Sequence, residues 1–534
     1  MSNRDIIEPV LEVHEIQGNI IPGFNKDHLV LIGYTVTNIS KAKQWFDFIS
    51  KHISTLYEVY NFNNVFKSIK NRKRSEPNEI SSTWTNLAIS YDGMSKLIDK
   101  VQEIDKFLDN SFKKGLSFMS SISLGDPNDF TSPGDSRNWV IGAKNKRSDH
   151  PNGLPDILLI VASDQVELLD KKVEFLKEKA EEYELINHYL EYGHDLSFYG
   201  DESRRGTEHF GFKDGVSQPG IRGRVSADFN KFLTDRKEDQ QSNPNLPELS
   251  NKGRPLIAPG EFILGYPIQN ENHPRDAELS RIIYPKFLLN GSYVVYRRLN
   301  QDVMAFERFI KREVEKIILN SNLIHMTEEK FKALLVGRWK SGAPLSLSPE
   351  QDNPDLGSNQ FENNLFDYDD DPRGLKTPAF SHIRKINPRN LSEQGGSGLV
   401  LKKMILRRGI PFGDLVDPLN ASSISKPRGL LFLSYQASIS DKFEFIIREW
   451  ANSKNRPHNP PSPTGNDSGN DFIIGQNVSN NRIRSGYIQY LTNGMSKEHE
   501  IKTQGLDILD WVTPTGGGYF FCPSISSIKL ISTL

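Results

Sequence analysis

The chain has 534 residues, of which 36% are hydrophobic and 10% aromatic, so it can bury a large core and should form roughly two to four folding units. Its 66 basic and 68 acidic residues leave a net charge of −2, so no overall positive field favours nucleic acid or an anionic membrane as a partner. The single cysteine, Cys522, excludes a disulfide within the chain and a cysteine-rich zinc or iron–sulfur site.

The N-terminal sequence has no apolar run of signal-peptide length, and no stretch approaches the ~20 apolar residues of a membrane-spanning helix. We therefore expect a protein that is cytoplasmic or released without a conventional signal peptide, with no membrane partner. The sequence leaves the oligomeric state open.

The first part of the chain alternates strand and helix patterns. Runs rich in Leu, Ile and Val predict strands, and apolar residues three or four positions apart predict amphipathic helices. The predicted order is strand 28–36, helix 41–60, strand 85–91, helix 92–107, a loop-rich stretch 126–152, strand 156–162 and helix 165–183.

A glycine-rich stretch, EHFGFKDGVSQPGIRG, follows at residues 208–223. Glycine adopts backbone angles that other residues avoid, and Pro219 fixes one dihedral angle. We expect a rigid loop that holds the carboxylate of Asp214 in a set direction, with Phe212 packed inward. The stretch alone leaves open a surface turn with a solvated aspartate.

The second half repeats the strand-and-helix pattern after a polar connecting segment, 228–256. We expect two α+β units, an N-terminal domain at 1–227 and a C-terminal domain at 257–534, each with helices packed on an antiparallel sheet. The elements predicted in the second unit are strands 292–298, 399–406, 430–435 and 516–522, helices 302–319, 327–339 and 441–452, and polar segments 344–372 and 455–470.

A second polar cluster lies in this half. His382 precedes several cations in PAFSHIRKINPR (378–389), and Arg407 ends an apolar run in ILRRGIPFG (405–413). These residue types suit a haem site, because imidazole binds iron axially and basic side chains pair with propionates. A carboxylate such as Asp214 would move a proton between the oxygens of a peroxide, and a fixed cation such as Arg407 would stabilise the charge that develops. Taken singly, His382 also fits a packed histidine and Arg407 a surface arginine.

With these motifs the chain resembles the dye-decolorizing peroxidase family, a group of haem peroxidases, and its long polar insertions resemble the longer branch. The resemblance implies an α+β fold of duplicated ferredoxin-like domains, with haem b (iron protoporphyrin IX) held mainly by the second half. The matching segments are IQGNII (16–21), LGDP (124–127), GFKDGVSQP (211–219), HIRKINPR (382–389), ILRRGIPFG (405–413), GLLFLSYQ (429–436), DFIIGQ (471–476) and GGGYFFCP (516–523).

The resemblance also implies a role for individual residues. The expected roles are His382 as axial iron ligand, Asp471 as the carboxylate that orients it, Asp214 as distal acid–base residue, Arg407 as distal arginine, Leu430, Phe432 and Phe212 as haem-pocket residues, Arg384 as a propionate contact, and Trp450 as a possible surface site for electron transfer. Arg408 could replace Arg407, but only one of two neighbours on a strand faces the pocket. For Trp450, packing at a helix end is an equal alternative.

The activity implied by the resemblance is a peroxidase, an EC 1.11.1 enzyme. Hydrogen peroxide would oxidise the haem by two electrons, and phenolic compounds or aromatic dyes would return them one at a time. A non-enzymatic haem-binding or haem-handling protein is the first alternative, although it would not need Asp214 with Arg407.

A metal-dependent hydrolase is a second alternative, with His188, Glu191 and His194 as ligands. Two histidines six residues apart do not share a helical face, which counts against it. No HExxH, GxSxG, Walker or dinucleotide motif is present. A third alternative, an interaction protein that uses the polar insertions, has no specific motif in its favour.

Overall fold

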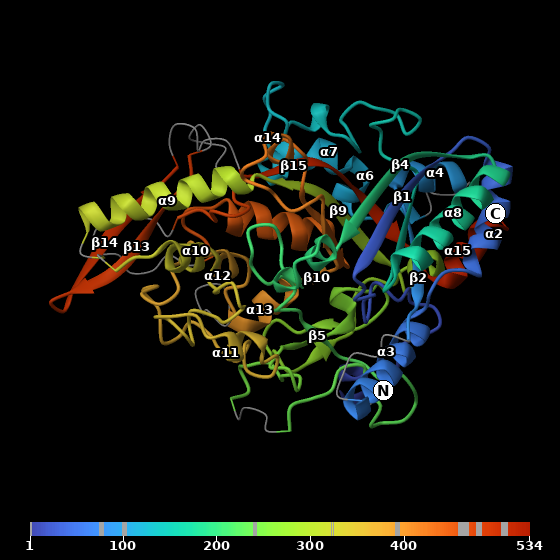
Figure 1. The fold of residues 1–534 in the computed structure, drawn as a ribbon. Helices are drawn as coiled ribbons and strands as arrows, with labels where there is room; N and C mark the ends of the chain where they lie inside the picture. The colour runs from blue at the N-terminus through green and yellow to red at the C-terminus, as the bar shows by residue number, and fades with distance from the viewer. Residues whose placement is uncertain are drawn as a thin grey trace.

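The computed structural model describes residues 3–73, 80–98, 104–238, 243–321, 323, 325–389, 396–457, 469–476, 483–503 and 511–533. Within these residues the chain is of the α+β class, as expected, with an antiparallel sheet at its centre and helices packed against it (Figure 1). No helix in the described part of the chain is both long enough and apolar enough to cross a membrane.

The two halves of the chain share one sheet. Its strands follow the order β10-β12-β9-β15-β2-β3-β1-β4, with β11 paired to β12, and all the pairings are antiparallel. The C-terminal strand β15 joins the halves, because it pairs along its length with β9 and meets β2 at Phe521 and Ile89. The strands are β1 (His28–Val36), β2 (Thr83–Ile89), β3 (Ile157–Ser163), β4 (Leu185–His194), β9 (Ser292–Gln301), β10 (Leu406–Arg407), β11 (Ile410–Phe412), β12 (Gly429–Gln436) and β15 (Val512–Cys522).

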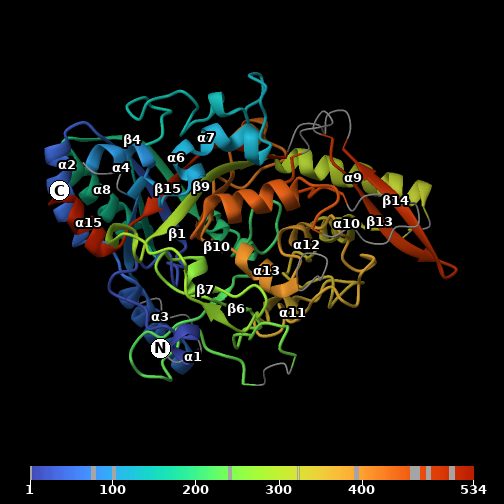
Figure 2. The same ribbon diagram turned by 180° about the vertical axis from the view of Figure 1, so that it is seen from behind.

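Three smaller pairs of strands lie outside this sheet. They are β5 (Gly220–Ile221) with β6 (Leu256–Ile257), β7 (Ile268–Gln269) with β8 (Ala277–Glu278), and β13 (Ser485–Thr492) with β14 (Met495–Lys502). β13 and β14 form a hairpin that projects from the body of the molecule beside α9, as Figure 1 and Figure 2 show from opposite sides.

Helices cover the sheet at both ends of the molecule. In Figure 1, α2, α4, α8 and α15 gather beside β1 and β2, whereas α9, α10 and α12 lie at the far end. The helices are α1 (Asn3–Ile7), α2 (Ile39–Ser50), α3 (Leu56–Lys73), α4 (Tyr91–Leu97), α6 (Asn110–Lys114), α7 (Leu116–Met119), α8 (Val166–Glu182), α9 (Val303–Asn320), α10 (Glu328–Val336), α11 (Pro354–Ser358), α12 (His382–Ile386), α13 (Gly396–Lys403), α14 (Ala421–Ile424) and α15 (Ile525–Ile531), with π-helical segments at Ile439–Glu444 and Ile446–Ala451.

The alternation of side chains across the strands explains the sequence pattern. β1 and β3 are buried on both faces, so both read as nearly continuous apolar runs. On β9, Tyr296 packs into the core on one face, while Arg297 and Leu299 point to the other face. β12 alternates in the same way, with Leu431 in that core and Phe432 on the opposite side. One face of this strand pair is therefore free to form the wall of a cavity.

Most predicted elements are present, but two of them are wrong. The helix predicted at 41–60 is two helices, because Thr55 and Glu58 form a capping box that starts α3 anew: the Thr55 N–H donates to Glu58 Oε2 at 2.7 Å, and the Glu58 N–H donates to Thr55 Oγ1 at 3.3 Å. The strand predicted at 399–406 is mostly the helix α13, whose Val400 and Leu401 are buried. A short apolar run does not distinguish a strand from a buried helix.

Other differences concern boundaries and missed elements. The helix predicted at 92–107 ends at Leu97, and residues 99–103 lie outside the described part of the chain. The strand β4 was missed because the half-buried residues Asn187, His188 and Glu191 interrupt its apolar pattern. Of the polar segment 455–470, residues 458–468 lie outside the described part. The division into domains at 228–256 remains a prediction.

The junction at Phe521 yields a stability prediction. Its ring is fully buried and packs against Tyr293, with ring centroids 5.5 Å apart. We expect Phe521→Ala to lower the free energy of unfolding by about 3–5 kcal/mol. The strands at the junction of β15 with β2 cannot move together to fill the space that the ring leaves. Denaturant unfolding measures this loss. The control Phe361→Ala removes a ring that is 51% exposed and should change stability by less than about 0.5 kcal/mol; equal effects would contradict a central role for the junction.

Candidate active site

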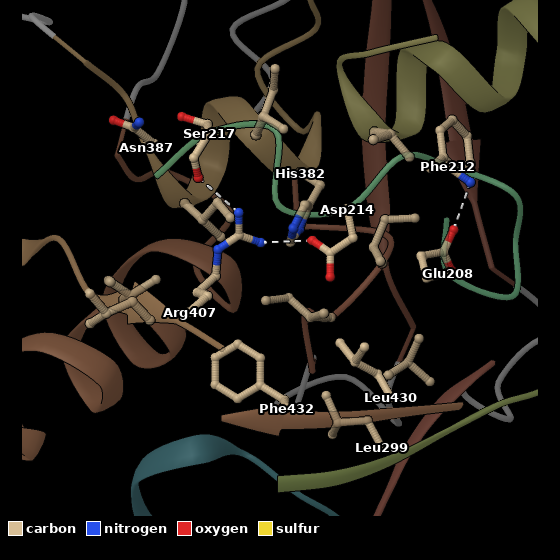
Figure 3. Close-up of a pocket in the computed structure, with 18 of the residues that line it drawn as sticks. Glu208, Phe212, Asp214, Ser217, Leu299, His382, Asn387, Arg407, Leu430 and Phe432 are labelled. Carbon is tan, nitrogen blue, oxygen red and sulfur yellow. Dashed lines mark hydrogen bonds and ion pairs between the residues drawn. The ribbon is translucent and has the colours of Figure 1, made fainter. Parts of the chain in front are cut away.

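A cavity of about 310 Å³ lies against the β9–β12 face of the sheet. The glycine-rich loop, α12 and the end of β10 form its other walls, so residues from both halves of the chain meet in it. Figure 3 shows His382, Asp214 and Arg407 together, with Leu430 and Phe432 on the sheet beside them. The structure thus brings together five of the residues that the sequence singled out.

His382 is the first residue of α12 and is held from behind. Its Nδ1 donates to Asp471 Oδ2 over 2.7 Å, and this carboxylate is fully buried. Asp471 Oδ1 accepts the N–H groups of Ile473 and Ile474, which fixes its direction. No described residue bonds to Nε2 of His382, which is therefore the ring nitrogen left for the cavity. A metal-binding histidine has this arrangement, because the carboxylate fixes the tautomer and strengthens the imidazole as a donor.

Asp214 and Arg407 form an ion pair in the cavity wall. Arg407 Nη1 lies 3.1 Å from Asp214 Oδ1, and Nη2 donates to the carbonyl of Ser217 at 2.9 Å (Figure 3). The carboxylate also accepts the N–H of Gly215, whose φ of 69° is a conformation that favours glycine. The two side chains remain about one-third exposed, so a small ligand can reach them.

Arg408 points away from the cavity. Its Nε donates to the carbonyl of Asn19 at 3.0 Å and its Nη2 to that of Ile20 at 2.9 Å. Burial lowers the pKa of Arg408 to about 10, so the guanidinium is still cationic at neutral pH. Of the two neighbouring arginines, Arg407 is the one that lines the cavity.

The structure corrects the placement of Arg384. This residue is fully buried behind the cavity, where its Nη1 donates to the carbonyl of Thr377 at 2.7 Å and its Nη2 to that of Asp371 at 2.9 Å. Residues two apart on a helix do not share a face, so Arg384 cannot lie on the side of His382. Arg389, from the same stretch of sequence, does line the cavity and is anchored to the carbonyl of Phe366 at 2.9 Å.

The structure also corrects the surface position of Trp450. Its side chain is only 2% exposed and packs edge-on against Phe445, with ring centroids 5.3 Å apart, next to Val400. The packing alternative is therefore the one that the fold favours.

Sequence reasoning missed Glu208, which opens the glycine-rich loop. Its carboxylate accepts the N–H groups of Phe210 and Phe212, both at 2.9 Å, and an N–H of Gln301 at 2.5 Å. These bonds tie the loop to β9 and turn Phe212 into the cavity wall. Burial raises the pKa of the Glu208 carboxyl. An acid that precedes the first glycine of the loop by three residues was the available signal.

The alternative metal site is not assembled. Glu191 and His194 lie on opposite faces of β4, and Glu191 pairs with Arg298 at 3.0 Å. His188 lies at an irregularity in the pairing of β4 with β1. His194 instead bonds to His28, with 2.9 Å between their Nδ1 atoms. The described residues contain no group of three or more His, Cys, Asp or Glu side chains that could hold a metal ion.

Comparisons with known proteins agree with this architecture. The model of the DyP dimeric alpha+beta barrel domain matches residues 15–190, and that of the Dyp-type peroxidase C-terminal domain matches residues 269–459. The dye-decolorizing peroxidase msp1 of Mycetinis scorodonius is 28% identical over 98% of this chain and 88% of its own length. The dye-decolorizing peroxidase AauDyP1 of Auricularia auricula-judae is 30% identical over 70% of this chain and 64% of its own length.

The fold agrees as well. A solved structure of a mutant dye-decolorizing peroxidase from Pleurotus ostreatus is 28% identical, covers 98% of this chain and 100% of its own, and superposes with a TM-score of 0.76. With the two matched domains, this likeness supports the expected duplicated ferredoxin-like fold. The chain therefore belongs to the dye-decolorizing peroxidase family and is a peroxidase that acts on dyes.

Proposed function

We propose that the chain is a haem b peroxidase that uses hydrogen peroxide to oxidise phenolic compounds and aromatic dyes by one-electron steps. One observation carries this proposal. A single cavity contains a histidine braced by a buried carboxylate, together with the Asp214–Arg407 ion pair. The first group suits an iron ligand, and the second suits the proton and charge movements of peroxide cleavage.

The residues of the cavity fit a haem. Leu299, Leu430 and Phe432 give an apolar wall that suits a porphyrin face, and the volume is in the range of cofactor pockets. His382 would hold the iron through Nε2, and Arg389 would pair with a propionate in place of Arg384. The bound haem would supply the electrons that reduce peroxide and would receive electrons from the donor.

Asp214 and Arg407 would divide the work on the peroxide. The carboxylate of Asp214 takes the proton from one peroxide oxygen and returns it to the other, which leaves as water. The guanidinium of Arg407, fixed by Asp214 and the Ser217 carbonyl, stabilises the negative charge on the departing oxygen. A protein that only binds or carries haem would need His382 but not this pair. Bleaching of an anthraquinone dye only when peroxide is added separates the two functions.

The role of Asp214 is tested by Asp214→Asn. The amide cannot accept the proton, so we expect the reaction with peroxide to slow by about 10²- to 10⁴-fold while haem stays bound. Stopped-flow absorbance of the haem band measures the rate. Asp47→Asn, which removes an exposed carboxylate on α2, serves as the control. An unchanged rate in Asp214→Asn would exclude the acid–base role.

The roles of His382 and Asp471 are tested together. We expect His382→Ala to lower the haem content of the purified protein, because the side chain proposed to hold the iron is lost. We expect Asp471→Asn to keep the haem but to raise its reduction potential, because a neutral partner makes the imidazole a weaker donor. Pyridine haemochrome assay and spectroelectrochemistry give the two values. Normal haem content in His382→Ala would point to another ligand.

The two adjacent arginines provide a matched pair. We expect Arg407→Met to slow the peroxide reaction without a large change in stability, because the Arg407 ion pair is one-third exposed. We expect Arg408→Met to destabilise the fold by about 1–3 kcal/mol, because it leaves the buried carbonyls of residues 19 and 20 without their donors. Peroxide kinetics and denaturant unfolding of both variants decide the assignment, and the reverse pattern would make Arg408 the catalytic arginine.

A further inference from the structure

A second cleft, of about 910 Å³, opens on the surface next to the haem cavity. Three segments that are distant in the sequence form most of it: residues 121–133, the junction of β9 and α9 at 300–304, and the segment 424–428 that leads from α14 into β12. Thr513 of β15 also lines it. Gly125, Asp126 and Pro127 of the LGDP motif line this cleft, but the chemistry of the peroxide reaction does not account for it.

The cleft and the haem cavity share a thin wall. Asp126 and Gln301 line both spaces, so only one layer of side chains separates them. The wall is rigid, because Asp126 is ion-paired with Arg297 at 2.9 Å and Gln301 is bonded to Glu208. A molecule in the cleft would therefore lie close enough to the haem cavity to pass an electron through this wall.

Arg428 gives the cleft a buried and oriented side chain that can bind a ligand. It is 96% buried, since only 4% of its surface is exposed, yet it lines the cleft. Its Nε donates to the carbonyl of Asp414 at 2.8 Å and its Nη2 to that of Ser423 at 2.6 Å. In the described part of the chain no residue accepts from Nη1. Burial lowers the pKa of Arg428, and the nearby carboxylates of Asp414 and Asp302 oppose that shift. Asp414 pairs with Lys426, and among the described residues no carboxylate oxygen bonds to the guanidinium of Arg428.

The other charges of the cleft leave Arg428 available to an anion. The charge of Asp126 is balanced by Arg297. Asp129 and Asp302 are exposed, where water screens them, and each already accepts a backbone N–H as a turn or helix cap. Because Arg428 is buried, its interaction with a bound oxyanion would be screened much less.

Apolar side chains at the rim complete the recognition surface. Ile122, on the first segment, is 63% exposed, and Ile424, on the third, is 40% exposed. Pro127 and Pro427 also line the cleft. A flat aromatic ring with an anionic substituent would bury this apolar surface and place its oxygens at the guanidinium.

We propose that this cleft binds aromatic electron donors that carry a carboxylate or sulfonate group, with Arg428 as the anion-binding residue. The inference rests on the proposed function and names a donor class for it. A phenolic donor held there would give up one electron across the wall of Asp126 and Gln301, and a haem bound in the cavity would supply the acceptor once hydrogen peroxide had oxidised it. Its hydroxyl proton passes to water, and a phenoxyl radical leaves the cleft.

Vanillate and guaiacol test the proposal, because they differ only by the carboxylate. In Arg428→Met and in Ile122→Asp, which sets a negative charge in the cleft, we expect the ratio of kcat/KM for vanillate to that for guaiacol to fall about tenfold. Ile283→Asp is the matched control, since Ile283 is 88% exposed and lies outside both spaces. It should leave the ratio unchanged. If Arg428→Met does not fold, Ile122→Asp still tests the cleft, because it changes an exposed residue at the rim.

Binding without peroxide gives an independent readout. Saturation-transfer NMR should detect vanillate on the wild-type holoprotein and on Ile283→Asp, but weakly or not at all on Arg428→Met and Ile122→Asp. Equal vanillate binding by all variants, or none by the wild type, would overturn the proposal. If the wild type did not react with peroxide, the proposed function would fail, while the binding measurement would still decide whether the cleft is a site.

Discussion

The position of β15 is the constraint on which the functional cavity depends. The last strand of the chain lies between β9, from the second half, and β2, from the first half. Its pairing makes one sheet out of two halves that the sequence presents as separate units. The loop that carries Asp214 is therefore held at a fixed place relative to β10, which carries Arg407, although 192 residues separate the two positions in the chain.

Burial, and not the ion pair, holds this arrangement together. An ion pair as exposed as Asp214–Arg407 contributes only about 0–1 kcal/mol to stability. Burying one large apolar side chain contributes about 1.5–3 kcal/mol, and one continuous core includes Val30 and Ile157 from the first half with Val295 and Phe521 from the second. The fold therefore holds the Asp214–Arg407 pair in place although the pair adds almost nothing to the stability of the fold. This is typical of charged groups that are retained for chemistry.

The sequence was most informative where the chemistry is concentrated in short motifs. His382, Asp214 and Arg407 each fit an ordinary structural role when taken singly, and they were singled out because the three residue types together suit a haem site and their motifs resemble those of the family. That Leu430 and Phe432 share a face followed from the two-residue repeat of a strand, whereas their place in the pocket was implied by the resemblance to the family.

The residues that were misplaced or missed show which structural information a sequence motif lacks. Arg384 lies in the same stretch as His382, but the direction of its side chain depends on where α12 begins. The helix starts at His382, after the N-cap residue Ser381, and this start was not recognised in the sequence. Trp450 lies on a π-helical segment, where the usual repeat of 3.6 residues does not give the exposed face. Glu208 escaped notice because its role is to bond backbone N–H groups, and its place three residues before the first glycine of the loop was the one signal of this in the sequence.

Gln301 links the two spaces of the molecule in a way that only the tertiary structure reveals. It lies at the end of β9, it bonds to the carboxylate that shapes the glycine-rich loop, and its side chain lines both the haem cavity and the outer cleft. The strand that forms the cavity wall thus also forms the inner surface of the cleft. In the proposed function, peroxide would need Asp214 and Arg407, whereas a bulky aromatic donor would need only electronic contact. The two could then use opposite sides of one wall. Such a separation would keep a large donor out of the space where the proton transfer requires close and fixed geometry.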